Sequence, residues 1–238
     1  AKMNIIERMV FEPKGGMFRE FMGLTTHFEP KDASLYRRLL PEQFAMPSQP
    51  IVAIFLADYL RVFPFPMTRY QEWSVLLKTE WKGEAGWYSA TMPVTSWVPM
   101  IGGQYLGFPK FVIEEISLKQ NGESCSARAI CKGSTQLTLE YHQGLTRPLN
   151  SWEKELVENE SFFKGNTHQL VPPGRGPRAQ KIIIRHVVNP KWSPEAGMIR
   201  IESNTSESWK GLIPDISEFP GTYNHFVGGF NLIAEKLN

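Results

Sequence analysis

One short segment, GGQYLGFPK at residues 102–110, combines glycine, proline, aromatic and charged residues between two β-like runs. The paired glycines permit a backbone turn that a Cβ would block, and Gly107 and Pro109 fix a second bend. Residues 111–118, FVIEEISL, follow with the composition of a β-strand. The segment therefore has a defined shape, and we take it as the point from which the rest of the chain is interpreted.

The position of this segment before a strand predicts where its polar side chains lie. We expect Lys110 at the start of the strand, and Gln104 and Tyr105 on the loop that precedes it. Loops that a sheet holds rigidly are where binding and catalytic residues concentrate. The segment is therefore the first candidate for a functional site.

Residues 106–110, LGFPK, resemble the LG(Y/F)PK signature of the acetoacetate decarboxylase family. Other pieces of the chain match the family in the same order: Arg19-Glu20-Phe21, Leu39-Leu40-Pro41, Tyr70-Gln71-Glu72, Pro172 and Gly176-Pro177-Arg178. The resemblance spans most of the chain and implies a cone-like β-barrel around a small pocket, with oligomerisation common. We expect one domain over residues 1–238, in a homo-oligomer.

The sequence departs from this family at the position that matters most for its chemistry. In the decarboxylases two adjacent lysines precede the signature, and the first forms a Schiff base with the ketone substrate. Gln104 and Tyr105 stand there in this chain, and an amide nitrogen is not nucleophilic. Schiff-base decarboxylation at position 104 is therefore excluded, although Lys110 or Lys78 could supply a relocated amine. We name Gln104, Tyr105, Phe108 and Lys110 as candidate substrate-binding residues.

Two further residues are candidates for catalytic roles through the resemblance. The family has a pocket arginine at the place of Arg19, where a guanidinium fork could hold a carboxylate, and a pocket glutamate at the place of Glu72. Tyr70 and Trp73 flank Glu72, and desolvation by their rings would suit the carboxylate to proton transfer. Simpler alternatives remain open: Arg19 could be a surface residue paired with Glu20, and Glu72 an exposed loop residue.

Composition excludes several classes of partner. The 238 residues are 42% hydrophobic, enough for one sizeable core, and their net charge of +2 without long charged blocks does not predict nucleic-acid binding. No apolar run approaches membrane-spanning length, so no membrane partner is expected. Cys125 and Cys131 are predicted to be reduced thiols, which favours a cytoplasmic protein. The five histidines lack metal-ligand spacing, and we predict neither a metal nor another cofactor.

The sequence contains many short β-like segments separated by turn-forming residues, and few helical segments. This pattern predicts a mainly β fold, a closed or cone-shaped antiparallel barrel. Asp32 should cap a short helix that ends at Pro41, and Asn121-Gly122 is the clearest hairpin turn. Residues 221–237 are predicted to form an amphipathic C-terminal helix, because Phe226, Phe230, Ile233 and Leu237 have helical spacing. Strands are expected at residues 51–60, 74–81, 87–98 with a break at Pro93, 124–131, 135–141, 181–185 and 197–201, a helix or surface excursion at 151–160 and a hairpin at 172–178.

Two hypotheses for function follow. The first is an acetoacetate decarboxylase-like enzyme, a lyase or related enzyme, that acts on a small oxo- or enol-acid without a Schiff base at position 104. In it Arg19 and Glu72 would be the polar groups of the pocket. The second is a barrel that keeps its pocket and binds a small ligand without turnover. Fold alone does not decide between them.

Overall fold

The computed structural model describes residues 18–62, 69–158, 166–170, 181–188, 194–216 and 218–236, apart from the side chains of 105, 166, 170, 181–188 and 228–236. The strands are β1 (Phe18–Phe28), β2 (Val52–Val62), β3 (Tyr70–Trp81), β4 (Glu84–Val94), β5 (Lys110–Val112), β6 (Glu115–Asn121), β7 (Ser124–Cys131), β8 (Ser134–Gln143), β9 (Asn166–Leu170), β10 (Lys181–Val188), β11 (Glu195–Ser203) and β12 (Glu218–Lys236). The helices are α2 (Ala33–Leu39), α3 (Trp97–Tyr105), α4 (Ser151–Glu158) and the short 3-10 helix η1 (Ser208–Leu212).

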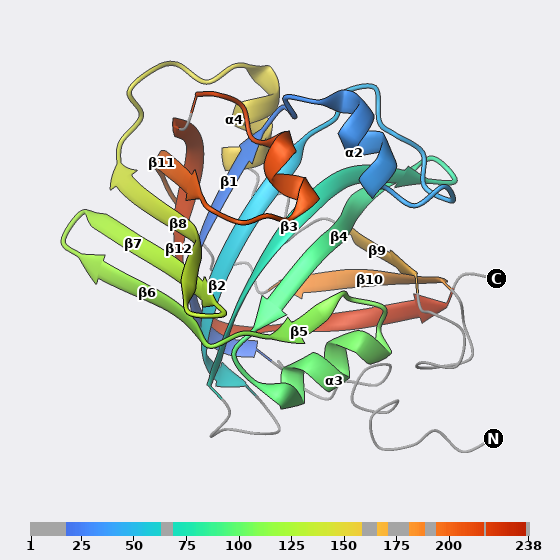
Figure 1. The fold of residues 1–238 in the computed structure, drawn as a ribbon, viewed down its shortest axis with the longest axis horizontal. Helices are drawn as coiled ribbons and strands as arrows, with labels where there is room; N and C mark the ends of the chain where they lie inside the picture. The colour runs from blue at the N-terminus through green and yellow to red at the C-terminus, as the bar shows by residue number, and fades with distance from the viewer. Residues whose placement is uncertain are drawn as a thin grey trace.

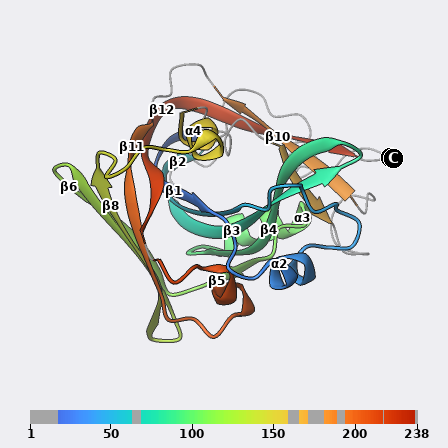
Figure 2. The same cartoon turned by 90° about the horizontal axis from the view of Figure 1, so that it is seen from above.

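The predicted mainly β architecture is confirmed. The strands form one sheet in the order β1-β2-β3-β4-β9-β10-β12-β11-β8-β7-β6, with β5 beside β4 (Figure 1). The sheet is open at β6, and it curls until β12 pairs with β1 as well as with β10 and β11. We call β1, β2, β3, β4, β9, β10 and β12 the curled part, and Figure 2 shows β6, β8 and β11 projecting to one side of it. The expectation of a closed, wholly antiparallel barrel is corrected, because β4 pairs in parallel with β5 and β9.

Residues 221–237 were expected to form a helix, and this prediction is wrong. Residues 218–236 form β12, a strand of 19 residues. The helical spacing of its apolar residues is outweighed by backbone pairing with three other strands, and Gly228-Gly229 disfavours a helix. Tertiary pairing therefore overrides the local pattern here.

The central segment also differs in part from the expectation. Gln104 and Tyr105 lie in the last turn of α3, not on a loop, and Lys110 begins β5 as predicted. The strand expected to continue to residue 98 ends at Val94, and Trp97 begins α3. Gly107 follows the helix with a φ of 85°, a conformation that favours glycine, and so reverses the chain toward β5. Figure 1 shows α3 and β5 packed together at one end of the sheet.

Several local predictions are confirmed. Asp32 caps α2 by accepting hydrogen bonds from the backbone of Ser34 and Leu35, and the chain turns between β6 and β7 at Gly122, whose φ is 60°. Cys125 and Cys131 are free thiols. None of the described helices is long and apolar enough to cross a membrane. The hairpin predicted at 172–178 lies outside the described residues.

Two hydrophobic clusters lie on opposite faces of the curled part. One lines its concave interior and includes Phe21, Tyr59 and Phe226. This face is the interior because the His27 ring of β1 meets the Trp87 ring of β4, two strands that are not neighbours, at 5.9 Å between centroids. The second cluster joins the outer face, through residues such as Trp73, to β6, β7, β8 and α2. The polar groups of the candidate active site lie among the side chains of the interior cluster.

Candidate active site

A buried ion pair joins β3 to β5 inside the curled part. The Nζ of Lys110 lies 2.6 Å from Oε2 of Glu72, and the two residues are 8% and 5% exposed. The hydroxyl of Tyr59 donates a hydrogen bond of 3.0 Å to the other carboxylate oxygen, Oε1. Both oxygens of Glu72 are therefore held by donors, which fixes the plane of the carboxylate.

Strand register explains why these residues meet. Glu72 pairs with Ala57 on β2 and with Val94 on β4, and β5 lies in parallel beside β4 so that Lys110 is level with Met92. Val94 is two positions along β4 from Met92, so Lys110 begins β5 close to Glu72 in the sheet.

The helix α3 also shapes the site around Lys110. A Cβ added to Gly103 would lie 2.3 Å from Cδ of Lys110, so the lysine stem occupies space that only glycine leaves open. The side-chain amide of Gln104 donates a hydrogen bond of 2.7 Å to the backbone carbonyl of Lys110. Gly103 therefore leaves space for the side chain of Lys110, and Gln104 holds the backbone of Lys110 in place.

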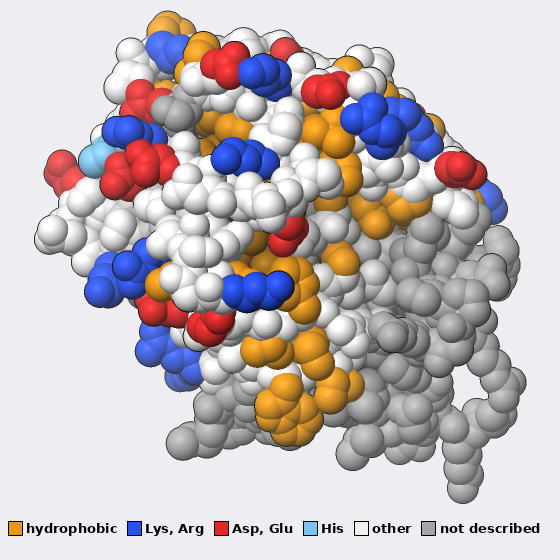
Figure 3. Space-filling view, viewed as in Figure 1, with side chains coloured by type: hydrophobic (Ala, Val, Ile, Leu, Met, Phe, Trp, Pro, Cys, Tyr) orange, Lys and Arg blue, Asp and Glu red, His pale blue; other side chains and the backbone are white. Residues whose placement is uncertain are grey.

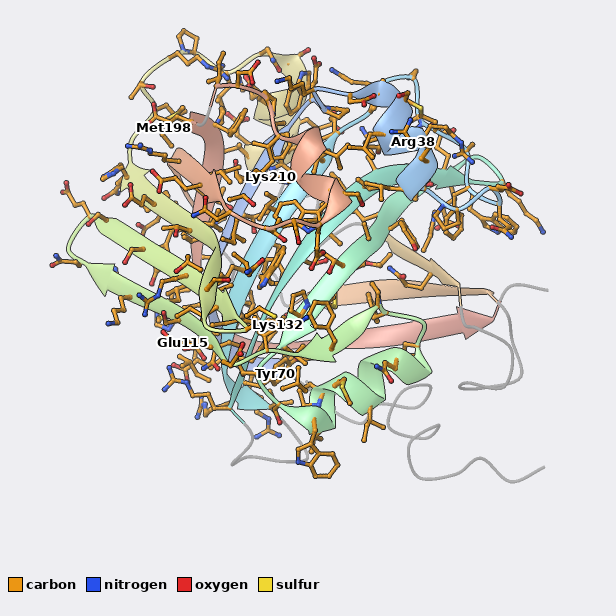
Figure 4. The ribbon with its side chains drawn as sticks, viewed as in Figure 1. Arg38, Tyr70, Glu115, Lys132, Met198 and Lys210 are labelled. Atoms are coloured by element: carbon orange, nitrogen blue, oxygen red, sulfur yellow. The ribbon has the colours of Figure 1, made fainter. Side chains whose placement is uncertain are left out.

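Aromatic rings surround the charged end of Lys110. Its Nζ lies 5.6 Å from the ring centroid of Tyr70 and 5.8 Å from that of Phe108, within range of cation–π attraction. Tyr70 stacks on Tyr59 with 4.8 Å between ring centroids, and Figure 4 labels Tyr70 at the end of the sheet near α3. The ion pair therefore sits in an aromatic, poorly hydrated setting.

The two tyrosine hydroxyls are held in their protonated form. Burial, followed by the negative charge of Glu72, raises the pKa of Tyr59 and of Tyr70 well above the usual value for a phenol. Both hydroxyls can therefore serve as hydrogen-bond donors at neutral pH. Together with the ammonium group of Lys110 they give the site several donors around one carboxylate.

Of the residues named from the sequence, Glu72, Lys110 and Phe108 come together, and Gln104 reaches them through the backbone of Lys110. Arg19 is exposed near the start of β1, whereas Glu72 is buried. The side chain of Tyr105 is outside the described part of the chain. Among the described residues, no three His, Cys, Asp or Glu side chains are grouped so as to hold a metal ion.

Tyr59 and Gly103 were missed as site residues. Tyr59 ends an apolar run that predicts a buried strand, and only its pairing with Tyr70 across β2 and β3 places it beside Glu72. Gly103 had been assigned to a turn, whereas its role is to leave room for Lys110. The contact of Tyr59 with Glu72 depends on the register of β2 against β3, and that of Gly103 with Lys110 depends on the chain reversal at Gly107.

Comparison with known proteins identifies the family of the chain. The family model described as "Acetoacetate decarboxylase (ADC)" matches residues 13–195. The chain belongs to the acetoacetate decarboxylase family. A comparison with the curated proteins gave no significant match.

Solved structures share the fold at low sequence identity. An acetoacetate decarboxylase from Legionella pneumophila is 15% identical, with a TM-score of 0.65 over 94% of this chain and 88% of that one. An acetoacetate decarboxylase-like enzyme from Sphingomonas wittichii RW1 is 17% identical, with a TM-score of 0.64 over 92% and 91%. The enduracididine biosynthesis enzyme MppR, in complex with the condensation product of pyruvate and imidazole 4-carboxaldehyde, is 14% identical, with a TM-score of 0.61 over 90% and 87%.

Proposed function

We propose that this member of the acetoacetate decarboxylase family is an enzyme, a lyase or a related catalyst, that acts on a small oxo- or enol-acid. The observation that carries the proposal is the buried pair of Glu72 and Lys110, with Tyr59 donating to the same carboxylate. A carboxylate beside an ammonium group and phenol donors can exchange a proton with carbon while the donors stabilise charge on oxygen.

The chemistry assigns a role to each group. Glu72 accepts a proton from the carbon next to a carbonyl, and the electron pair of that C–H bond moves to form the enolate. The carbonyl oxygen takes up the negative charge, and an N–H of Lys110 or the hydroxyl of Tyr59 donates a hydrogen bond to it. Return of the proton from Glu72 to either carbon or oxygen completes the transfer without any covalent link to the protein.

Support for an oxo-acid comes from a structural relative. MppR is described in complex with pyruvate, a small 2-oxo acid, on the same fold. The cation of Lys110 and its aromatic surroundings suit a ligand that has an anionic oxygen and a short carbon skeleton. A homo-oligomeric, cytoplasmic protein is part of this proposal, through the family resemblance and the free thiols.

The same geometry argues for chemistry without an imine. The sequence resemblance puts Gln104 where the family has its Schiff-base lysine, and the amide of Gln104 donates a hydrogen bond to the backbone of Lys110. The amine of Lys110 is itself in an ion pair, and an ammonium nitrogen has no free electron pair with which to attack a carbonyl. Lys110 therefore acts as a hydrogen-bond donor in this proposal.

Hydrogen exchange at carbon tests the proposed function. Pyruvate is incubated with the protein in D₂O, and loss of the methyl proton signal is followed by NMR. The wild type should exchange the methyl protons faster than buffer, and Glu72→Gln should lower the rate by about 10²–10⁴-fold, the usual range for loss of a general base. Tyr59→Phe, which removes only the hydroxyl, should lower it by a smaller factor.

The matched control is Glu123→Gln, because Glu123 is exposed beside the turn between β6 and β7. This variant should keep the wild-type rate. If the wild type exchanges protons at the buffer rate but binds pyruvate, the alternative of a non-catalytic small-ligand-binding protein is favoured. If Glu72→Gln, folded by circular dichroism, exchanges as fast as wild type, the role of Glu72 is wrong.

Borohydride reduction tests the absence of an imine. The protein is treated with acetoacetate and borohydride, and its intact mass is measured. We expect no adduct. A stoichiometric increase in mass that maps to Lys110 or Lys78 would show that the reactive amine has moved to that residue.

A further inference from the structure

A second set of polar groups faces the interior farther along β3 than Glu72. It comprises Thr25 and His27 of β1 and Gln169 of β9, which are buried, and Lys78 of β3, which is partly exposed. Lys78 is six residues from Glu72 along β3, a separation of about 20 Å in an extended strand. Lys78 is therefore remote from Glu72, while Thr25 and His27 lie level with Ser74 and Leu76 of β3, between the two.

Strand register shows that these side chains share one face. The His27 ring meets Trp87 at 5.9 Å, and Trp87 pairs with Lys78 on one side and with Thr167 on the other. Gln169 is two residues beyond Thr167, so it points to the same side of the sheet. The residue between them, His168, faces the other way and contacts the Phe44 ring at 5.8 Å.

The polar atoms of this set are buried without partners. Thr25, His27 and Gln169 are 2%, 4% and 0% exposed. The Oγ1 of Thr25, both ring nitrogens of His27 and both amide atoms of Gln169 have no hydrogen-bond partner in the part of the chain that the structure describes. Each such atom costs about 1–3 kcal/mol if it stays unpaired in the folded protein. A fold rarely keeps several together unless something else satisfies them.

Lys78 gives this set its charge. It makes no ion pair with a described carboxylate, in contrast to Lys110, which is paired with Glu72. The pKa of the His27 imidazole is lowered to about 3, mainly by burial and secondly by the positive charge of Lys78. A neutral imidazole, a primary amide and one cation therefore face the same part of the interior.

We propose that this end of the interior is a second ligand site, which binds the carboxylate group of a small acid between Lys78, His27 and Gln169. One carboxylate charge balances the one cation, whereas a dianion would leave a net negative charge beside the buried His27 and Gln169. The N–H of His27 and the amide NH₂ of Gln169 donate to the carboxylate oxygens, so the unpaired donors become paired. Water can satisfy neutral groups of this kind, whereas a carboxylate also pairs with the partly exposed cation of Lys78.

NMR of histidine-labelled protein titrated with acetate tests the site at constant pH and ionic strength. The ring signal of His27, assigned by its absence in His27→Gln, should shift and reach saturation. Lys78→Met should weaken acetate binding by at least about tenfold, the effect of one charged hydrogen bond. Lys119→Met, at an exposed position on β6, is the matched control and should bind acetate as the wild type does.

Other outcomes would overturn the inference. No saturable shift of His27 would mean that water alone fills the site, and unchanged binding in Lys78→Met would remove the cation from it. Binding of phosphate as tight as that of acetate would contradict the preference for a single charge. Glu72→Gln should leave acetate binding intact; if it abolishes binding, acetate occupies the Glu72–Lys110 site, and this inference fails while the proposed function stands.

Discussion

Glu72 and Lys110 are 38 residues apart in sequence, and their side chains form an ion pair of 2.6 Å inside the protein. Removing two charges from water is costly, and each of these charges is tolerated because the other is present. The pair therefore links the stability of the β3–β5 region to the site in which we propose that chemistry occurs.

Single replacement of either partner should destabilise the fold by about 3–5 kcal/mol, because it leaves the other charge buried and uncompensated. Glu72→Gln and Lys110→Met should each show this loss in urea unfolding, and the double variant should lose less than the sum. The control pair is Arg128 and Glu115, half-exposed at 3.0 Å, whose disruption should cost at most about 1 kcal/mol. Additive losses at Glu72 and Lys110 would contradict a coupled pair.

The neighbouring glycines of α3 make a second, matched comparison. Gly103→Ala places a methyl group 2.3 Å from Lys110 and should destabilise the protein by about 1–3 kcal/mol, as overpacking does. Gly102→Ala meets nothing within 4 Å in the same helix and should be neutral or stabilise by up to about 1 kcal/mol. Thermal unfolding of both variants measures the difference. Equal effects would show that Lys110 does not depend on the space at Gly103.

The buried His27 predicts a dependence of stability on pH. The pKa of its imidazole is about 3 in the folded protein and about 6.5 when unfolded, so the unfolded chain binds more protons between these values. The contribution of His27 to stability is present above pH 6.5 and is lost as the pH falls toward 3. The free energy of unfolding should fall by up to about 1.4 kcal/mol per pH unit in that window because of this residue.

The variant His27→Gln isolates this effect in urea unfolding between pH 7 and pH 3. Its stability should fall less steeply than that of the wild type. Lys78→Met should raise the pKa of His27 in the folded protein, because Lys78 is the second cause of the lowered pKa. The pH range over which His27 reduces stability should therefore become narrower. Parallel curves for wild type and His27→Gln would contradict the prediction.

An exposed apolar patch predicts where copies of the chain associate. Trp97 and Ile101 of α3 and Val112 of β5 are 65%, 44% and 47% exposed, and Figure 3 shows hydrophobic side chains gathered over this end. Exposed apolar surface of this kind marks interaction sites. Light scattering after gel filtration should find an oligomer, and Trp97→Ser with Ile101→Ser should shift it toward monomer. Ile216→Ser, at an equally exposed site elsewhere, is the control.

Local chemistry explains which parts of the fold could be predicted. The Asp32 cap and the turn at Gly122 depend on a few adjacent residues, so their sequences identify them. The strand β12 could not be predicted from its own residues, because its partners on β1 lie about 200 positions away and its apolar spacing fits a helix. Short-range patterns carry no information about such pairing.

The candidate site likewise contains residues that the sequence identifies and residues that it does not. Glu72, Phe108 and Lys110 belong to short motifs that the family resemblance identifies, and these three are brought together. The contact of Tyr59 with Glu72 depends on the register of β2 against β3, which no local pattern sets. The exposed position of Arg19 likewise follows from how β1 is paired and curled, not from its neighbours in sequence.

The pairing of β12 has a consequence for how the protein is made. It joins β11 at its first residues, β1 in its middle and β10 at its last described residues. While the polypeptide emerges from the ribosome, β1 therefore cannot pair with β12 until some 190 further residues have been translated. Until then, β1 and β10 present open edges on which other chains can pair, so a chaperone that shields strand edges should raise the yield of native protein during synthesis.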